Sequence, residues 1–200
     1  MKKLTILFAA MLLIQFVDAQ SLTKAERKSA VKYLQWSSKE LYKSLKSLST
    51  AQLNFHESDR WSPQECLYHI AFSEGALRGA LDGALNAPAD PSSRAELQAT
   101  DDQIKAMITN RTTKVKTAPP FEPQNTGYKS YDEALSAYKA KRAMLIDFVK
   151  TTKSDLRNHV VTLPLGKMDA YQFVLFISGH TNRHTQQLNE VKMASGYPKG

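Results

Sequence analysis

Four segments of this chain each combine a helix-capping residue with apolar residues spaced three and four apart. In the first, Thr23 and Glu26 form a capping box, in which a hydroxyl and a carboxylate satisfy two unpaired backbone N–H groups. This spacing places the following apolar side chains on one stripe of a helix. The stripe consists of Val31, Leu34, Leu41, Leu45 and Leu48. The pattern predicts an amphipathic helix that packs along one face.

The second and third segments carry equally clear start signals. Ser62 precedes Pro63 and Glu65, which predicts a helix that begins at Pro63, where a missing N–H costs nothing, and runs to about Asn86. Ser130 with Glu133 begins the third helix, which ends near Ser154. Its apolar residues are Leu135, Tyr138, Leu145, Ile146 and Val149. Both segments are therefore predicted to be long core-facing helices.

The fourth helix is predicted to begin after Asp169 and to end before Gly196 and Pro198. Its inward stripe contains two histidines among apolar residues: Phe173, Ile177, His180, His184, Leu188 and Val191. Four long amphipathic helices without a credible sheet predict an all-α fold, a four-helix bundle.

The connections between these helices are uneven in length. Residues 87–128 form a long crossover excursion between the second and third helices, with a short helix within 99–113 and an extended loop at Pro119, Pro120 and Pro123. Leu53 and Phe55 fall in the connection that leads to Trp61. The segment 160–166 has an extended pattern, but a lone strand would have no pairing partner, so we interpret it as a structured connection.

The first 19 residues have the pattern of a secretory signal peptide. Lys2 and Lys3 precede an apolar stretch at 4–17, and small residues at Val17 and Ala19 suit cleavage before Gln20. The stretch is shorter than the roughly 20 residues that span a bilayer, and we expect no membrane span after cleavage. The prediction is an exported protein, periplasmic or secreted, with residues 20–200 as a single domain of ordinary size.

Composition limits the partners of the chain. Its single cysteine, Cys66, excludes an intrachain disulfide, so stability comes from packing. The formal net charge is +8, which suggests acidic partners, but the lysines are spread over solvated helix faces. No basic run is interleaved with aromatic residues, and we expect no nucleic-acid partner. The sequence leaves a homodimer open and does not identify a small-molecule substrate or ligand.

The histidine pair in the last helix is the main chemical signal. His180 and His184 are four residues apart and project from one helix face, where two imidazoles can share one cation. With five histidines in the chain, chance alone produces such a pair in about one chain in ten. Both replace apolar residues of the inward stripe, however, so their buried ring nitrogens need partners. Those partners are a metal ion or, alternatively, backbone and carboxylate groups.

His69 is a candidate third ligand, because it lies two turns into the second helix and neighbouring bundle helices pack closely. Three imidazoles leave room for water, which is the arrangement of catalytic rather than structural sites. Residues that could orient the ligand rings, or that could simply be exposed polar side chains, are Glu65, Gln187 and Glu190.

Four further residues are of types that take part in metal or thiol chemistry or that pack beside such sites. His56 and His159 stand in connections without helical partners, so we leave them out of the site. Cys66 could be a ligand or a reactive thiol, but its apolar surroundings favour packing. Trp61 is interpreted as a core anchor.

Short motifs in this order resemble the DinB-like family of bacterial bundles. They are Trp61-Ser62-Pro63, Tyr68-His69-Ile70, Pro164-Leu165-Gly166 and the run from Gly179 to Gln187 that includes His180 and His184. The resemblance implies a four-helix bundle with a divalent ion held by His69, His180 and His184. It also implies relatives that are thiol-dependent transferases and isomerases or metal-dependent hydrolases. Family members are often cytoplasmic, and because small thiol cofactors are kept there, the leader argues against a thiol transferase role.

Three functional hypotheses follow from these observations. The first is a metal-dependent hydrolase or transferase whose ion activates water or polarises a substrate. No catalytic acid, base or nucleophile is identifiable for it. The second is a non-catalytic metal- or ligand-binding stress-response module of the cell envelope, and the third is an envelope interaction protein whose histidines bind nothing. Zn, Ni, Fe and Mn are the candidate divalent ions, imidazole also suits copper, and the residues do not select among them.

Overall fold

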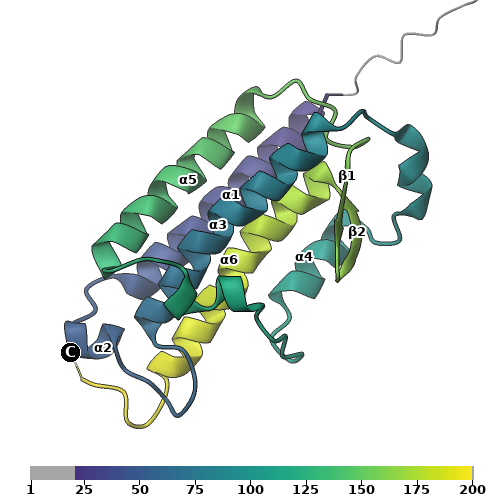
Figure 1. Cartoon of the computed structure of the whole chain (residues 1–200). Helices are drawn as coiled ribbons and strands as arrows, with labels where there is room; N and C mark the ends of the chain where they lie inside the picture. The colour runs from purple at the N-terminus through teal and green to yellow at the C-terminus, as the bar shows by residue number, and fades with distance from the viewer. Residues whose placement is uncertain (1–20, 200) are drawn as a thin grey trace, which may run out of the picture.

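The computed structural model describes residues 21–199, and the signal peptide predicted for residues 1–19 lies outside them. Four long helices run side by side in this part of the chain (Figure 1). They are α1 (Lys24–Leu45), α3 (Pro63–Asn86), α5 (Tyr131–Thr151) and α6 (Ala170–Lys192). The predicted four-helix bundle is confirmed. Within residues 21–199, no helix has the length and apolar character needed to cross a membrane.

The predicted capping residues stand at the start of all four helices. Thr23, Ser62 and Asp169 each form a complete capping box, and the Ser130 hydroxyl accepts from the backbone N–H of Glu133. Each box satisfies two N–H groups that the helix itself leaves unpaired. The local sequence therefore defines where the helices begin.

The helices are not arranged in sequence order around the bundle. Helix α1 packs against α5 and α6, and α3 packs against the same two helices. The sequence neighbours α1 and α3 therefore lie diagonally across the core. Helix α6 supplies the largest share of buried residues, including Phe173, Ile177, Leu188 and Val191 of the predicted stripe.

A buried ion pair joins all four helices at the centre of the bundle. Arg142 of α5 bonds both carboxylate oxygens of Glu74 of α3, at 2.6 and 2.8 Å, and both side chains are 2% exposed. The guanidinium also donates to Leu34 O and Ser37 Oγ of α1 and to Thr181 Oγ1 of α6. Burial of an arginine is tolerated because its donors all find acceptors.

The long connection between α3 and α5 returns to the bundle. It contains the 3₁₀ turns η1 (Pro91–Glu96), η2 (Pro119–Phe121) and η3 (Pro123–Asn125), together with α4 (Asp101–Thr109). Helix α4 is the short helix predicted within residues 99–113. It packs on α6 through the buried side chains of Ile104 and Ile108. The connection therefore adds a wall to the bundle near the middle of α6.

Two local elements differ from the sequence prediction. A short helix, α2 (Thr50–Leu53), interrupts the expected connection before Trp61. The segment interpreted as a connection without strands forms a hairpin, in which β1 (Val160–Leu163) pairs antiparallel with β2 (Gly166–Asp169). Its partner strand, Gly166-Lys167-Met168-Asp169, lacks the β-branched residues typical of strands, which explains the error. The pairing places Val161 opposite Met168, and both are buried.

Candidate metal centre

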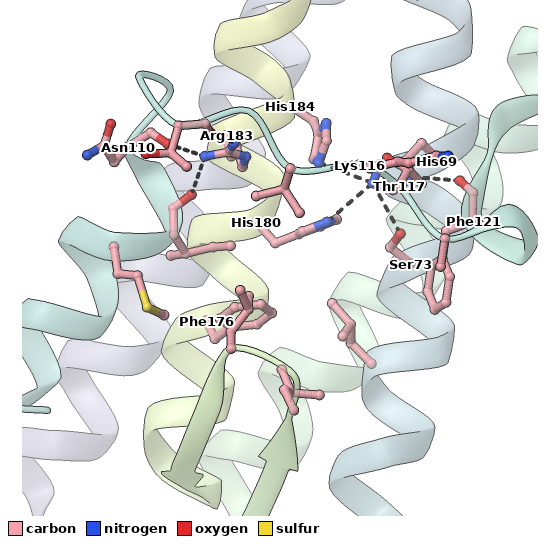
Figure 2. A pocket seen from close by; sticks show the side chains of 18 residues that line it. His69, Ser73, Asn110, Lys116, Thr117, Phe121, Phe176, His180, Arg183 and His184 are labelled. Carbon is pink, nitrogen blue, oxygen red and sulfur yellow. Dashed lines mark hydrogen bonds between the residues drawn. The ribbon is translucent and has the colours of Figure 1, made fainter. Parts of the chain in front are cut away.

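The structure brings the three predicted histidines to one point. His69 projects from α3, and His180 and His184 project from successive turns of α6 (Figure 2). The Nε2 atom of His69 lies 3.2 Å from Nε2 of His180 and 3.1 Å from Nε2 of His184. His69 and His184 are buried, whereas His180 is partly exposed. The cluster therefore has one open side.

Hydrogen bonds fix the tautomers of two of these rings. His69 Nδ1 lies 2.7 Å from the carbonyl oxygen of Phe121, and His184 Nδ1 lies 2.9 Å from Oε1 of Gln187. Because both partners are acceptors, each Nδ1 carries the proton and donates it. In the neutral ring Nε2 then presents a lone pair. The Nε2 lone pairs of His69 and His184 thus face each other across 3.1 Å, and neither ring can donate a hydrogen bond to the other.

The surroundings keep the rings neutral. Burial lowers the pKa of His69, although its hydrogen bond to the Phe121 carbonyl opposes the shift. The pKa values of His180 and His184 lie well below the usual range, first because of burial and then because neighbouring imidazoles would repel a second charge. The rings are therefore neutral at neutral pH, and Nε2 of His69 and of His184 presents a lone pair to a ligand.

The donor set fits a divalent metal ion. Two nitrogen ligands at about 2.0–2.1 Å from a tetrahedral ion lie about 3.3 Å from each other. The observed separations of 3.1 and 3.2 Å are close to that value. A cation between the rings would also supply the partner that the facing lone pairs need.

The predicted ring-orienting residues differ in their roles. Gln187 holds His184, which is one of the two possibilities that the sequence left open for it. Glu65 instead closes the capping box of α3 on the backbone N–H of Ser62, at 2.8 Å. Glu190 pairs with Arg111, also at 2.8 Å, and Arg111 Nη1 lies 3.5 Å from Gln187 Oε1. Of the two possibilities that the sequence left open, Glu65 does not orient a ligand ring, and Glu190 reaches His184 only through Arg111 and Gln187.

Trp61 has a second role that its interpretation as a core anchor did not include. The indole packs at the edge of the core, and its ring lies 4.9 Å from that of His69 and 6.0 Å from that of His184, between centroids. It therefore covers one side of the histidine cluster. Cys66, by contrast, is fully buried among apolar residues, and burial raises the pKa of its thiol, as expected for packing.

The two histidines left out of the site have backbone partners elsewhere. His56 Nδ1 contacts the carbonyl oxygen of Arg60 at 3.1 Å. His159 contacts the carbonyl oxygens of Asp155 and Ala87. Within residues 21–199, only His69, His180 and His184 form a group of three or more potential ligands.

A cavity of about 400 Å³ lies beside the cluster. Its walls come from α3, α4, the loop that follows α4, the tip of the hairpin and α6, so segments far apart in sequence meet there. Arg183 of α6 holds the loop in place by donating to the carbonyl oxygens of Asn110 and Thr113, the latter at 2.7 Å (Figure 2). This wall of the cavity could not be predicted from the sequence, because the loop that follows α4 has no periodic pattern.

A comparison of sequences with protein families agrees with this geometry. The sequence profile of the DinB superfamily matches residues 33–188, a span that includes all three histidines. The chain belongs to the DinB superfamily. A search of curated proteins found no match to this DinB-superfamily chain.

A solved structure shares the fold of this DinB-superfamily chain. YfiT from Bacillus subtilis aligns with 90% of this chain and 93% of its own, with a TM-score of 0.53 and 11% sequence identity. It is described as a probable metal-dependent hydrolase with an unusual four-helix bundle topology. At this identity the likeness shows the four-helix bundle fold alone.

Proposed function

We propose that this chain is an exported metal-dependent hydrolase that holds one divalent ion through His69, His180 and His184. The observation that carries the proposal is the inward orientation of the Nε2 atoms. Their separations of 3.1 and 3.2 Å suit ligands of a single ion, and the acceptors at Phe121 and Gln187 keep two of the rings in the required tautomer. The description of YfiT as a probable metal-dependent hydrolase supports the reaction class.

The residues around the cluster have distinct roles in such a site. A bound divalent ion would act as a Lewis acid toward a substrate oxygen and would acidify water. Trp61 packs against the rings of His69 and His184 and is not among the described residues that line the cavity. The Ser73 hydroxyl, 3.5 Å from His69 Nε2, lines the cavity and is placed to hydrogen-bond a reacting group. Arg183 keeps the wall formed by Asn110 and Thr113 in position over the site.

Metal analysis of untagged protein tests the ligand set. We expect about one divalent ion per chain in the wild type, and loss of that ion in His184→Ala with helical content retained. His159→Ala is the matched control, because His159 bonds backbone carbonyls outside the cluster and should keep the ion. Wild-type protein that takes up no ion from a solution of zinc, nickel, iron or manganese would overturn the proposal.

One observation favours the alternative of a non-catalytic metal- or ligand-binding stress-response module. No Asp or Glu is among the described residues that line the cavity, so a carboxylate general base is missing from its walls. A panel of ester, amide and phosphoester substrates separates the two functions. Hydrolysis that disappears in His184→Ala supports the hydrolase. Transfer of the substrate group to an added acceptor would support a transferase instead. Metal-dependent thermal stability without any turnover supports the module.

The export proposal rests on residues 1–19 alone. Lys2 and Lys3, the apolar stretch and the small residues at Val17 and Ala19 support cleavage before Gln20. Sequencing of the N-terminus of protein recovered from the periplasm or the medium should start at Gln20. Recovery of the intact chain from the cytoplasm alone would contradict it.

A further inference from the structure

The charged side chains that line the cavity beside the histidines are all positive. They are Lys116 and Arg183, and no acidic side chain is among the described residues that line the cavity. Arg183 donates from Nη1 and Nη2 to backbone carbonyls of Asn110 and Thr113, and these neutral partners do not neutralise its charge. The walls therefore present positive charge alone.

The proposed metal ion would add to the positive charge of the cavity. This part of the inference rests on the proposed function. Three imidazoles are neutral ligands, whereas carboxylate ligands would cancel part of the charge of the ion. A divalent ion held by His69, His180 and His184 keeps its two positive charges. Because the cluster borders the cavity, the positive end of the cavity is the end at the histidines.

The rest of the cavity is apolar. Apolar side chains from α4, the hairpin and α6 line it, together with Phe121, whose backbone carbonyl contacts His69. Those from α4, the hairpin and α6 are Met107, Ile108, Leu163, Leu165 and Phe176. Met107 and Leu165 are 41% and 50% exposed, so the apolar surface continues to the mouth. Ligand cavities of this size, about 300–1,000 Å³, commonly combine apolar walls with a few polar groups that set orientation.

We propose that the cavity binds an amphipathic carboxylate, with the negative group toward the histidines and Lys116 and the apolar body between Phe176 and Leu165. Charge complementarity selects the head of the ligand, because a cationic head would meet Arg183, Lys116 and the ion. The apolar walls select the body, because burial of its surface removes both partners from water. For the proposed hydrolase, such a carboxylate corresponds to the acid that cleavage of an ester or amide releases beside the ion.

Calorimetric titration with three probes of equal chain length tests this inference. The probes are decanoate, decanol and decylammonium, added to the purified protein in its zinc-loaded and metal-free forms. We expect decanoate to bind at least tenfold more tightly than decanol to the zinc-loaded form, and decylammonium to bind most weakly. In the metal-free form the preference for decanoate should be smaller but present, because Lys116 and Arg183 remain.

Paired variants assign the preference to the cavity. Lys116→Gln should weaken decanoate binding about twofold to fivefold, the effect of one exposed charge, and leave decanol binding unchanged. Lys114→Gln is the matched control, since Lys114 is exposed in the same loop but does not line the cavity. Leu165→Ser should weaken decanoate and decanol equally.

The outcomes separate this inference from the proposed function. A protein that binds zinc but prefers decanol or decylammonium over decanoate overturns the carboxylate inference and leaves the metal site standing. A protein that binds no metal but still prefers decanoate, in a manner that depends on Lys116, overturns the proposed function and supports the inference. Equal effects of Lys116→Gln and Lys114→Gln would contradict the assignment to this cavity.

Discussion

Ile108 of α4 packs directly on Gly179 of α6, the residue that precedes His180. A Cβ atom at Gly179 would overlap the Cγ2 methyl of Ile108 and would lie 3.3 Å from the Tyr33 hydroxyl. The missing side chain thus allows α4 to approach α6 at the level of the histidines. Because Ile108 also lines the cavity, this contact sets the width of the proposed substrate site.

Gly179→Ala should destabilise the protein and loosen the cavity wall. Overpacking of a buried contact costs about 1–3 kcal/mol, and the gain in helix propensity offsets at most about 1 kcal/mol of it. Urea unfolding should show a lower free energy of unfolding. Gly83→Ala is the control, because Gly83 lies in helix α3 and a Cβ atom added there meets open space. This substitution should stabilise the protein by about 0.5–1 kcal/mol. Equal effects of the two substitutions would refute the close contact.

The Arg142–Glu74 pair leads to a prediction about coupling. Arg142→Met should cost about 3–5 kcal/mol of stability, because it leaves the Glu74 carboxylate buried without its partner. The double variant Arg142→Met with Glu74→Leu should recover a large part of that loss, since no unpaired charge remains. Urea unfolding of both single variants and the double variant measures the coupling. Additive losses would show that the two side chains act independently.

The helices could be predicted from the sequence because their signals are local. Thr23, Ser62, Ser130 and Asp169 cap helices within a few residues of themselves, and the apolar stripes follow from the helical period. The hairpin was missed because its second strand, Gly166–Asp169, has a weak propensity and is recognisable only by its pairing. Gly166 has a φ of 121°, which suits a turn, but this backbone conformation is not visible in the sequence alone.

The three histidines of the site could be predicted from the sequence, but their hydrogen-bond partners could be predicted only in part. His180 and His184 were found by their helical spacing, and His69 by the resemblance and by its place in the second helix. The partner of His69 could not be predicted, because it is the backbone carbonyl of Phe121, a group that every residue carries. The ion pair of Arg142 with Glu74 was also missed, since the two residues lie 68 positions apart and each resembles a surface charge.

Gln187 is predicted to tune the metal affinity. Its Oε1 accepts from His184 Nδ1, so Gln187→Leu removes the acceptor that fixes the ring orientation. The affinity for zinc should fall about 10- to 100-fold, the usual effect of losing such a partner. A competition titration with a zinc chelator measures it. Gln186→Leu is the control, because Gln186 bonds Thr109 O and Asn182 rather than a ligand ring. An unchanged affinity in Gln187→Leu would rule out this role.

The metal-free protein should lose stability as the pH falls below about 6.5. The pKa values of His69, His180 and His184 are all lower in the folded chain than the ordinary value of 6.5, mainly because of burial. As the pH falls, the unfolded chain therefore takes up protons before the folded chain does, and the free energy of unfolding decreases. Above pH 6.5 both states are neutral at these rings, and the contribution is fully present.

Urea unfolding of metal-free protein at pH 7.5 and 5.5 checks this sign, with His184→Asn as a variant that should show a smaller decrease. The affinity for zinc should fall over the same range, because protons and the ion compete for the same Nε2 lone pairs. Zinc binding that is unchanged between pH 7.5 and 5 would contradict ligation by histidine. A metal-free protein that gains stability at pH 5.5 would show instead that the three rings are charged in the folded chain, in conflict with their burial and their tautomers.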